Sequence, residues 1–250
     1  MKDFAREHAI ASRFPDVGVP SSVGVAGLSA VGLGAVPFRP ALLPDRYQGR
    51  YRGWGKRVLD VAIVVFSLPV TLFVVAVCAI ALWIEGGQPF YTQDRLGRNG
   101  KRFKILKLRT MVRDADTLLE TCLAADPQLR QEWNITQKLK QDPRVTRLGA
   151  VLRATSLDEL PQLWNVLTGE MSLVGPRPMM PDQLSIYGDP RAYFALRPGV
   201  TGAWQVSARN ERGFETRAPI DADYHTYVSL REDLLILLRT IGVVLRRTGY

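Results

Sequence analysis

An apolar run at residues 61–84, 24 positions without a charged side chain, constrains the fold of this chain more than any other feature. An α-helix rises about 1.5 Å per residue, so a helix of this length could cross a hydrocarbon core of roughly 30 Å. The alternative, a buried helix of a soluble protein, is disfavoured because the run is so long and so uniformly apolar. The run therefore predicts a helix inside a membrane.

Basic residues flank this run on both sides, and they bear on how the helix sits in the membrane. Such an excess of bases is typical of the cytoplasmic side, and a single straight span would place one of the two groups outside. A helix that enters and leaves through the same face removes this conflict, so a re-entrant anchor is favoured over a true span. The bases are Arg50, Arg52, Lys56 and Arg57 before the run and Arg95, Arg98, Lys101, Arg102, Lys104, Lys107 and Arg109 after it.

The sequence Ser67-Leu68-Pro69 offers a bend inside the run. Pro69 removes one backbone hydrogen bond and clashes with the preceding turn. Ser67 is expected to satisfy a carbonyl that the bend frees. Asp60, near the start of the helix, is expected at the membrane interface beside Lys56 or Arg57.

The chain divides into three segments by composition. Residues 1–50 are rich in Gly, Pro, Ser, Ala and Val, with prolines interrupting every candidate helix, and they predict a disordered lead. This lead lacks the basic start and apolar core of a secretory signal. Residues 51–88 form a basic, aromatic collar and the re-entrant helix. Residues 89–250 are predicted to form a cytoplasmic catalytic domain with helices on the membrane surface.

The charge balance points to an anionic partner. The net charge is +9 and the isoelectric point is near 9.8, which suits an anionic phospholipid bilayer or phosphorylated substrates. Nucleic acid is disfavoured, because few aromatic residues interleave with the bases and no binding module is evident. The two cysteines and two histidines lack the spacing of a zinc site or of a Ser-His-Asp triad.

Residues 153–178 carry the chemistry that we consider most informative. Asp158 and Glu159 are adjacent carboxylates at an expected helix start, and Arg177 stands between two prolines that stiffen its loop. With Arg153 nearby, this set suits a phosphate group held with a divalent metal. Two plainer readings stay open: a capping box from Ser156 to Glu159, with Asp158 as the alternative cap, and a simple turn around Arg177.

The remaining pattern predicts a mostly α fold with a few short strands. Strands are expected at residues 89–93 and 103–108, joined through a turn at Asn99-Gly100. Trp204 and Tyr224 are expected to pack rather than react, and residues 212–218 read as a polar loop. Amphipathic helices should surround a small cytoplasmic catalytic domain beside the re-entrant membrane helix. They are expected at residues 113–126, 127–139, 146–153, 179–188 and 230–247.

Taken together, these motifs resemble the bacterial sugar transferase family, the monotopic phosphoglycosyl transferases that begin glycan assembly on a polyprenyl phosphate. The likeness covers residues 56–250 and leaves residues 1–50 outside. One departure concerns the bend, since family members commonly carry adjacent Ser-Pro deeper in the helix, whereas Leu68 separates the pair here. The motifs lie at residues 56–60, 107–111, 153–163, 169–178, 197–202, 221–224 and 233–240.

The resemblance implies a reaction and a place for it. A UDP-linked hexose, galactose or glucose, would give its sugar-1-phosphate to undecaprenyl phosphate as the first membrane step of exopolysaccharide or glycan synthesis, and UMP would leave. Asp158 would be the nucleophile that forms an aspartyl phosphosugar, and Glu159 would help hold Mg²⁺. The protein would sit in the bacterial inner membrane with its catalytic domain facing the cytoplasm, and a homodimer is one arrangement that stays open.

The resemblance also implies further substrate contacts. Two arginines of the central stretch would bind phosphate, an aspartate would position or activate the lipid acceptor, and three more residues would contact uridine or pyrophosphate. The alternative function is a non-catalytic membrane scaffold that recruits glycan assembly proteins through its basic face. The arginines that would bind phosphate are Arg153 and Arg177, and the aspartate is Asp221. The residues that would contact uridine or pyrophosphate are Arg197, Gln205 and Arg209.

Overall fold

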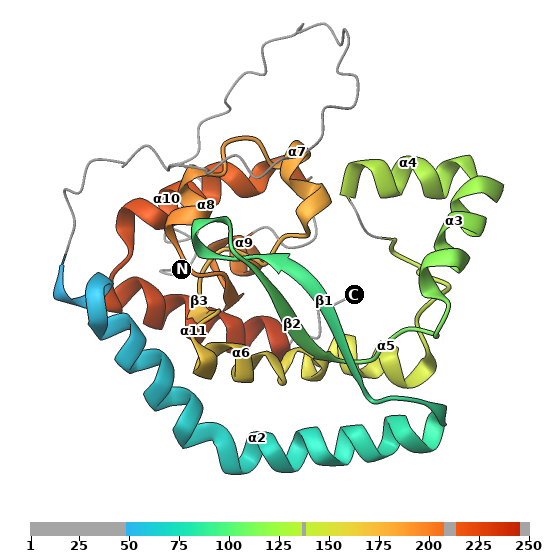
Figure 1. The fold of residues 1–250 in the computed structure, drawn as a ribbon, viewed down its shortest axis with the longest axis horizontal. Coiled ribbons are helices and arrows are strands. Elements are labelled where there is room, and N and C mark those ends of the chain that lie inside the picture. Colours follow the sequence, from blue (N-terminus) through green and yellow to red (C-terminus); the bar gives the residue numbers. More distant parts are fainter. Residues whose placement is uncertain (1–48, 137–138, 208–213, 246–250) are drawn as a thin grey trace, which may run out of the picture. The chain divides into compact units, whose positions relative to one another are not determined.

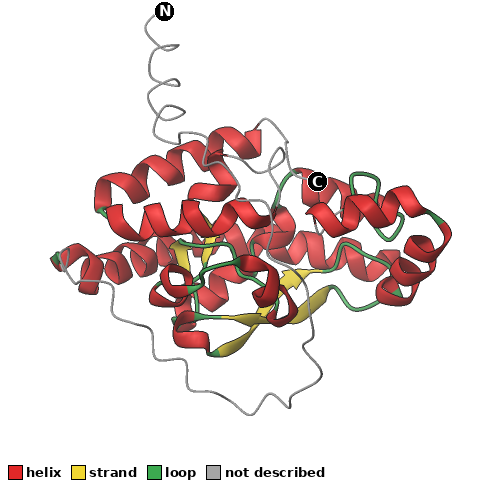
Figure 2. Cartoon of the chain, turned by 90° about the horizontal axis from the view of Figure 1, so that it is seen from above, coloured by secondary structure: helices red, strands yellow, loops and turns green. Residues whose placement is uncertain are grey.

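The computed structural model describes residues 49–136, 139–207 and 214–245. All of them belong to one compact unit that comprises residues 38–250. Its described part is mostly helical, with short strands among the helices (Figures 1 and 2), as predicted. The expected lead at residues 1–50 lies outside the described residues except for its last two positions.

The elements follow one another with short connections. The strands are β1 (Phe90–Leu96), β2 (Arg102–Leu108), β3 (Ser172–Val174) and β4 (Gly199–Thr201). The helices are α2 (Lys56–Gly86), α3 (Ala115–Ala125), α4 (Pro127–Thr136), α5 (Arg147–Ala154), α6 (Gln162–Thr168), α7 (Leu184–Tyr187), α8 (Arg191–Ala195), α9 (Ala203–Ser207), α10 (Arg217–Tyr227) and α11 (Leu230–Leu245). A π-helical turn covers Tyr51–Gly55, and 3₁₀ turns cover Arg98–Gly100, Leu157–Glu159, Pro181–Gln183 and Phe214–Thr216. The helices predicted at residues 113–126, 127–139, 146–153 and 230–247 are confirmed to within a few residues at their ends, whereas the one predicted at 179–188 is a 3₁₀ turn followed by the short α7.

Helix α2 is one continuous helix that contains Pro69 and changes direction part-way along (Figure 1). Ser67 Oγ donates to the carbonyl of Val64, at 3.0 Å. Our expectation for Ser67 was therefore wrong in detail, because the carbonyl that loses its helical partner to a proline is four residues back, at Val65. The serine bond falls on the neighbouring carbonyl instead.

Both ends of α2 pack against the same globular unit. Near its start, Asp60 accepts hydrogen bonds from Ser172 Oγ at 2.8 Å and from the backbone N–H of Leu173 at 3.0 Å. Near its end, Leu82 is fully buried in a cluster with Leu108 and Leu152. Asp60 is only 2% exposed, because two donors from the β3 segment satisfy the carboxylate inside the protein. Its expected place at the membrane interface stays a prediction.

The residues around Asp60 fasten the start of α2 to the C-terminal part of the chain. Lys56 Nζ donates to the Tyr224 hydroxyl at 3.1 Å and forms an ion pair with Asp233. Arg57 donates to the carbonyl of Leu167 at 2.7 Å, at the C-terminal end of α6, where a helix carries partial negative charge. The motif at residues 56–60 is thus explained by attachment of the apolar helix.

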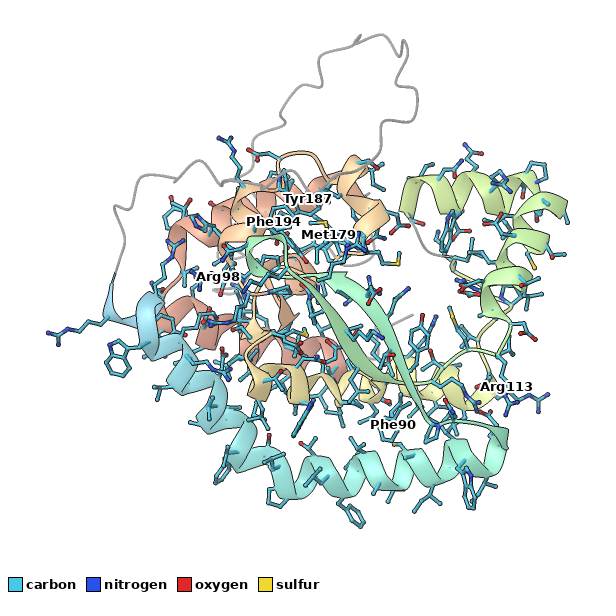
Figure 3. All side chains as sticks on the ribbon, in the orientation of Figure 1. Phe90, Arg98, Arg113, Met179, Tyr187 and Phe194 are labelled. Atoms are coloured by element: carbon cyan, nitrogen blue, oxygen red, sulfur yellow. The ribbon has the colours of Figure 1, made fainter. Side chains whose placement is uncertain are left out.

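The outward face of α2 is apolar and exposed. Phe66, Phe73 and Trp83 are 90%, 70% and 71% exposed, and side chains stand out along this face in Figure 3. Among the described residues, the Tyr51–Gly86 segment is the one helix long and apolar enough to cross a membrane. A soluble monomer rarely exposes so large an apolar patch, and such patches mark interaction with a membrane or a partner.

The hairpin of β1 and β2 forms the centre of the unit. The strands pair antiparallel, with Phe90 opposite Leu108 and Gln93 opposite Ile105. Asn99 has φ 60°, so the predicted turn is confirmed. Phe103 and Ile105 pack in one core cluster, Leu108 packs on the opposite face of the strand with Leu82 and Leu152, and Lys104 is exposed. Met179, Tyr187 and Phe194 pack in a second cluster near the turn end of β1 (Figure 3).

Residues 214–218 differ from the polar loop that we expected. Phe214 is buried and Arg217 begins α10. The guanidinium of Arg217 lies 4.3 Å from the ring centroids of both Trp204 and Phe214. Trp204 is itself buried, and so is Tyr224, which confirms their packing roles. The sequence did not indicate that Arg217 is buried, because the stacking of an arginine on aromatic rings depends on tertiary contacts.

Candidate active site

Asp158 and Glu159 lie in a 3₁₀ turn between α5 and α6, not at the start of a long helix. Ser156 has a left-handed backbone conformation with φ 56°, and its side chain makes no capping hydrogen bond. Helix α6 begins four residues after Asp158, with Pro161 in the cap position. Capping therefore does not account for the two carboxylates, and the helix start that we expected at Asp158 was misplaced.

Two bases from other elements meet these carboxylates. Lys107 Nζ, from β2, lies 2.8 Å from Glu159 Oε1 and 3.9 Å from Asp158 Oδ2. Arg177 Nη2, from the loop after β3, lies 3.3 Å from the same Glu159 oxygen. Burial raises the pKa of Asp158 above its usual value, and the Glu159 charge adds to this, while Lys107, Arg153 and Arg177 oppose it.

A crossing of two backbone segments holds Arg177 in place. A Cβ on Gly175 would lie 2.3 Å from the carbonyl oxygen of Arg197, and one on Gly202 would lie 2.0 Å from the carbonyl oxygen of Gly175. Real Cβ atoms do not approach so closely, so both positions need glycine. The parallel pairing of β3 with β4 brings the two segments together. The two glycine-proline motifs in the sequence are thus two halves of one rigid junction.

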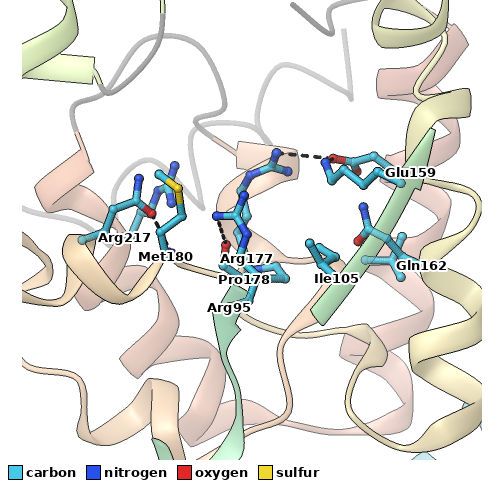
Figure 4. Close-up of a pocket in the computed structure, with 11 residues that line it drawn as sticks. Arg95, Ile105, Glu159, Gln162, Arg177, Pro178, Met180 and Arg217 are labelled. Atoms are coloured by element: carbon cyan, nitrogen blue, oxygen red, sulfur yellow. Dashed lines mark hydrogen bonds and ion pairs between the residues drawn. The ribbon is translucent and has the colours of Figure 1, made fainter. Parts of the chain in front are cut away.

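Glu159 borders a small basic pocket of about 120 Å³, and the adjacent Asp158 does not line it. In Figure 4, Arg95, Arg177 and Arg217 gather on one side of this pocket, across from Glu159. Lys107 also lines it. Four cations around one carboxylate in a small space favour an anionic ligand such as a phosphate or diphosphate.

Arg95 and Arg217 line the same small pocket as Arg177, so their positive charges repel one another. Burial, together with the charge of Arg177, lowers the pKa of Arg217 to about 9 and that of Arg95 to about 10. Both groups stay charged at neutral pH. A bound diphosphate would relieve this repulsion. Sequence reasoning did not single out either residue for the site: Arg95 was counted among the flanking bases, and Arg217 fell in the expected loop.

A second, apolar groove of about 210 Å³ adjoins the basic pocket. Its walls come chiefly from α6, β4, α9 and α11, and they include Leu163, Leu237 and Val244. Three residues line both spaces: Glu159, Arg177 and Val200. The carboxylate and the guanidinium thus stand where a polar space meets an apolar one.

The other predicted site residues are placed in different ways. Arg153 Nε donates to Thr110 Oγ1 at 2.9 Å, and its charge lowers the pKa of Asp158, so it belongs to the carboxylate side of the site. Gln205 lines the apolar groove. Arg197 Nε donates to the Gly169 carbonyl at 2.9 Å and lines neither space. Arg209 lies outside the described residues.

Asp221 lies beneath the basic pocket rather than on its wall. It is 3% exposed and accepts a hydrogen bond from the Tyr187 hydroxyl. Burial raises its pKa to about 7, against the effects of Tyr187 and Arg217, which lower it. From this place Asp221 contributes to the charge environment of Arg217.

The donor set at the carboxylates is compatible with one type of metal. Within the described ranges, no group of three or more His, Cys, Asp or Glu residues gathers to form a metal cage. Mg²⁺, however, is usually bound through one or two carboxylates, substrate phosphates and water. Glu159, on the wall of a pocket suited to phosphate, and the adjacent Asp158 fit that pattern.

Comparison with known proteins places this geometry in a family. The family described as bacterial sugar transferase matches residues 51–247. The chain belongs to the bacterial sugar transferase family. The resemblance seen in the sequence motifs is therefore confirmed, and residues 1–50 lie outside the match.

Several curated relatives of this sugar transferase carry informative names. It is 48% identical over 197 residues to a "UDP-galactose-lipid carrier transferase" of Erwinia amylovora, covering 78% of this chain and 41% of the relative. It is 46% identical over 206 residues to the "Exopolysaccharide production protein ExoY" of Rhizobium meliloti, covering 79% and 89%. An "Undecaprenyl-phosphate galactose phosphotransferase" of Salmonella typhimurium is 45% identical over 199 residues, covering 78% and 41%. The match thus spans less than half of two of these proteins and most of the third.

Proposed function

We propose that this sugar transferase moves a sugar-1-phosphate from a UDP-sugar to undecaprenyl phosphate and releases UMP. The observation that carries the proposal is Glu159, next to the buried Asp158, at the junction of a basic pocket and an apolar groove. A water-soluble diphosphate suits the first space, and a lipid suits the second. The relatives' printed names, a galactose-lipid carrier transferase and an undecaprenyl-phosphate galactose phosphotransferase, favour a galactose donor.

The reaction would proceed in two displacements at the same phosphorus. An oxygen of the Asp158 carboxylate attacks the β-phosphorus of the UDP-sugar, and the bond from that phosphorus to the bridging oxygen breaks, with its electron pair leaving on UMP. An oxygen of the acceptor phosphate then attacks the phosphorus, and the bond to Asp158 breaks. The products are a lipid diphosphate sugar and the restored carboxylate.

The surrounding residues have defined tasks in this scheme. Lys107, Arg153 and Arg177 favour the ionised form of Asp158, which is the nucleophile. Arg95, Arg177 and Arg217 offset the charge on the transferring group. Mg²⁺ held by Asp158 and Glu159 would supply further neutralisation of the diphosphate.

The arrangement of α2 supports a re-entrant anchor on the cytoplasmic side of the inner membrane. Asp60 at one end and Leu82 at the other contact the same unit, which favours a re-entrant helix over a span whose ends would lie roughly 30 Å apart on opposite faces of the bilayer. The exposed apolar face between these contacts then enters the lipid. Such an anchor would hold the carboxylates level with the headgroup of the acceptor.

The test is a product assay with purified protein and a panel of UDP-sugars. With undecaprenyl phosphate and Mg²⁺ present, we expect UMP and a lipid-linked sugar from UDP-galactose, and loss of both products when a chelator removes the metal. A membrane scaffold would bind lipid vesicles but release no UMP from any donor. That outcome, with folded protein, would reject the proposed activity.

A further inference from the structure

The residues that line the apolar groove between α6 and α11 indicate what kind of molecule could bind there. Leu163 of α6 and Leu237 and Val244 of α11 face into it. It reaches Glu159 and Arg177, which together with Val200 also line the basic pocket. A long apolar molecule in this groove would therefore present its polar end to the reacting groups.

The helices that form the groove also carry exposed apolar side chains on their other faces. Leu238, Ile241 and Leu245 are 65%, 57% and 76% exposed along one stripe of α11, and Trp164 of α6 is 62% exposed. Helix α6 in turn lies beside α2 (Figure 1), and the outer face of α2 is also apolar. These three helices form a surface suited to lipid, and the groove lies between two of them.

One polar side chain in the groove wall has no hydrogen-bond partner within the described part of the chain. Gln205 is 6% exposed, and neither its amide nitrogen nor its amide oxygen has a hydrogen-bond partner among the described residues. A buried amide without partners is costly, and its N–H₂ group can donate to a phosphate oxygen. The hydroxyls of Thr201 and Thr240, which also line the groove, form a hydrogen bond with each other at 2.7 Å. They are therefore not unsatisfied polar groups in the groove.

We infer that this groove holds the isoprenoid chain of the lipid phosphate acceptor, with the acceptor phosphate at the Arg177 and Glu159 end. The inference rests on the proposed function, and it deepens that proposal by assigning the two substrates to separate spaces. The donor diphosphate occupies the basic pocket, the acceptor chain lies between α6 and α11, and the two phosphates meet at the shared wall. Arg177 then contacts both substrates from its rigid loop.

The first test is photolabelling of the unmodified protein, which reads binding whether or not turnover occurs. A benzophenone-tagged farnesyl phosphate should label peptides that contain residues 160–163 or 237–244, and undecaprenyl phosphate should compete. Label confined to α2 would overturn the inference. Competition by a phospholipid of the same charge, with no effect of undecaprenyl phosphate, would overturn it too, because the groove would then hold an ordinary acyl chain.

The second test compares two tryptophan variants of α11. Val244→Trp fills the groove and should raise the KM for undecaprenyl phosphate by roughly tenfold or more, as expected when an apolar pocket loses space, with the KM for the UDP-sugar unchanged. Ile241→Trp, on the exposed side, should leave both values unchanged. A rise in the KM for the UDP-sugar alone would assign the groove to the nucleotide, and no change in either constant would also contradict the inference.

The two tests separate the two proposals. If the wild-type protein binds the photolabel in the groove but transfers no phosphosugar, the proposed activity fails and the binding site stands. If the protein transfers phosphosugar but shows no label in the groove and no effect of Val244→Trp, the activity stands and the groove assignment fails. Thermal unfolding of both variants checks that each one folds.

Discussion

Arg217 is the residue whose role the structure changes most. It lines the basic pocket while its guanidinium lies between the rings of Trp204 and Phe214. Stacking of this kind depends on the flat guanidinium, which lysine lacks. The positive charge and the geometry of the group can therefore be tested separately.

We expect Arg217→Lys to raise the KM for UDP-galactose by roughly tenfold, about 1.4 kcal/mol, because the charge remains but its fixed position is lost. Arg191→Lys is the matched control, since Arg191 is exposed and pairs with Asp189. Steady-state assays on the two variants measure the KM for UDP-galactose. Equal KM values for Arg217→Lys and the wild type would show that the stacked geometry does not matter.

Asp221 predicts how stability depends on pH. Its pKa is raised to about 7 in the folded protein from an ordinary value of 3.8. Between these values the folded state holds a proton that the unfolded state has released, so this group's contribution to stability is present below pH 4 and is lost as the pH rises through 7. The Asp221→Asn variant removes this titration, because an amide side chain does not ionise in this range.

The unfolding temperature of the wild type, minus that of Asp221→Asn, should therefore be larger at pH 5 than at pH 8. The change in this difference should correspond to a few kcal/mol at most. Titrations that both proteins share cancel in the subtraction. A difference that is constant across this range, or that grows with pH, would show that Asp221 is ionised in the folded protein throughout.

At the residue scale, the sequence was informative where local chemistry was unusual. Adjacent carboxylates and an arginine between two prolines stand out in any reading, and the structure brings Glu159 and Arg177 to within 3.3 Å. We did not predict Arg95 and Arg217 as site residues, because the residues next to them in the sequence do not indicate that these side chains are buried. Their places follow from contacts with segments far away in the chain.

At the scale of elements, the junction between β3 and β4 is the feature that positions the site. Gly175 and Gly202 allow the two backbones to touch, and Arg177 follows two residues after the first of them. Side-chain chemistry at the pocket therefore depends on a contact between backbones.

Gly175→Ala should disturb this junction, because the new Cβ would lie 2.3 Å from the Arg197 carbonyl oxygen. We expect a loss of stability of roughly 1–3 kcal/mol, as is usual for overpacking, and a fall in transfer activity. Gly242→Ala is the control, since a Cβ there meets nothing within 4 Å and alanine favours a helix. Thermal unfolding and product assays on both variants provide the measurement; an unperturbed Gly175→Ala protein would show that the junction tolerates movement.

Elements were the most predictable level of this fold. The apolar run, the alternation at residues 103–108 and the amphipathic pattern after residue 230 each gave the right kind of element. The sequence pattern did not predict which side of α2 faces the protein. The short strands β3 and β4 were also missed, because three-residue strands leave almost no periodic signal.

At the scale of the whole molecule, the contacts at the two ends of α2 bear on how this helix sits in a membrane. The contacts of Asp60 and Leu82 with one unit favour a helix that enters and leaves the membrane on one face. The basic residues on both flanks favour the same arrangement independently.

Cysteine labelling in sealed, right-side-out membrane vesicles tests this topology. Gly53→Cys and Asp94→Cys, each in a Cys78→Ser, Cys122→Ser background, place single thiols at exposed positions before and after the apolar run. Both thiols should react with an impermeant reagent only after the vesicles are opened. Reaction of one thiol in sealed vesicles and not of the other would establish a true span.

The most direct test of the account follows the β-phosphorus of UDP-galactose with a radioactive label. Without acceptor, we predict UMP release and label bound to the peptide that contains Asp158; adding undecaprenyl phosphate should then move the label to lipid. Asp158→Asn should lower transfer on the order of 10³-fold or more, whereas Asp94→Asn, an exposed control on β1, should behave as wild type. Transfer to lipid by Asp158→Asn at the wild-type rate would contradict the account.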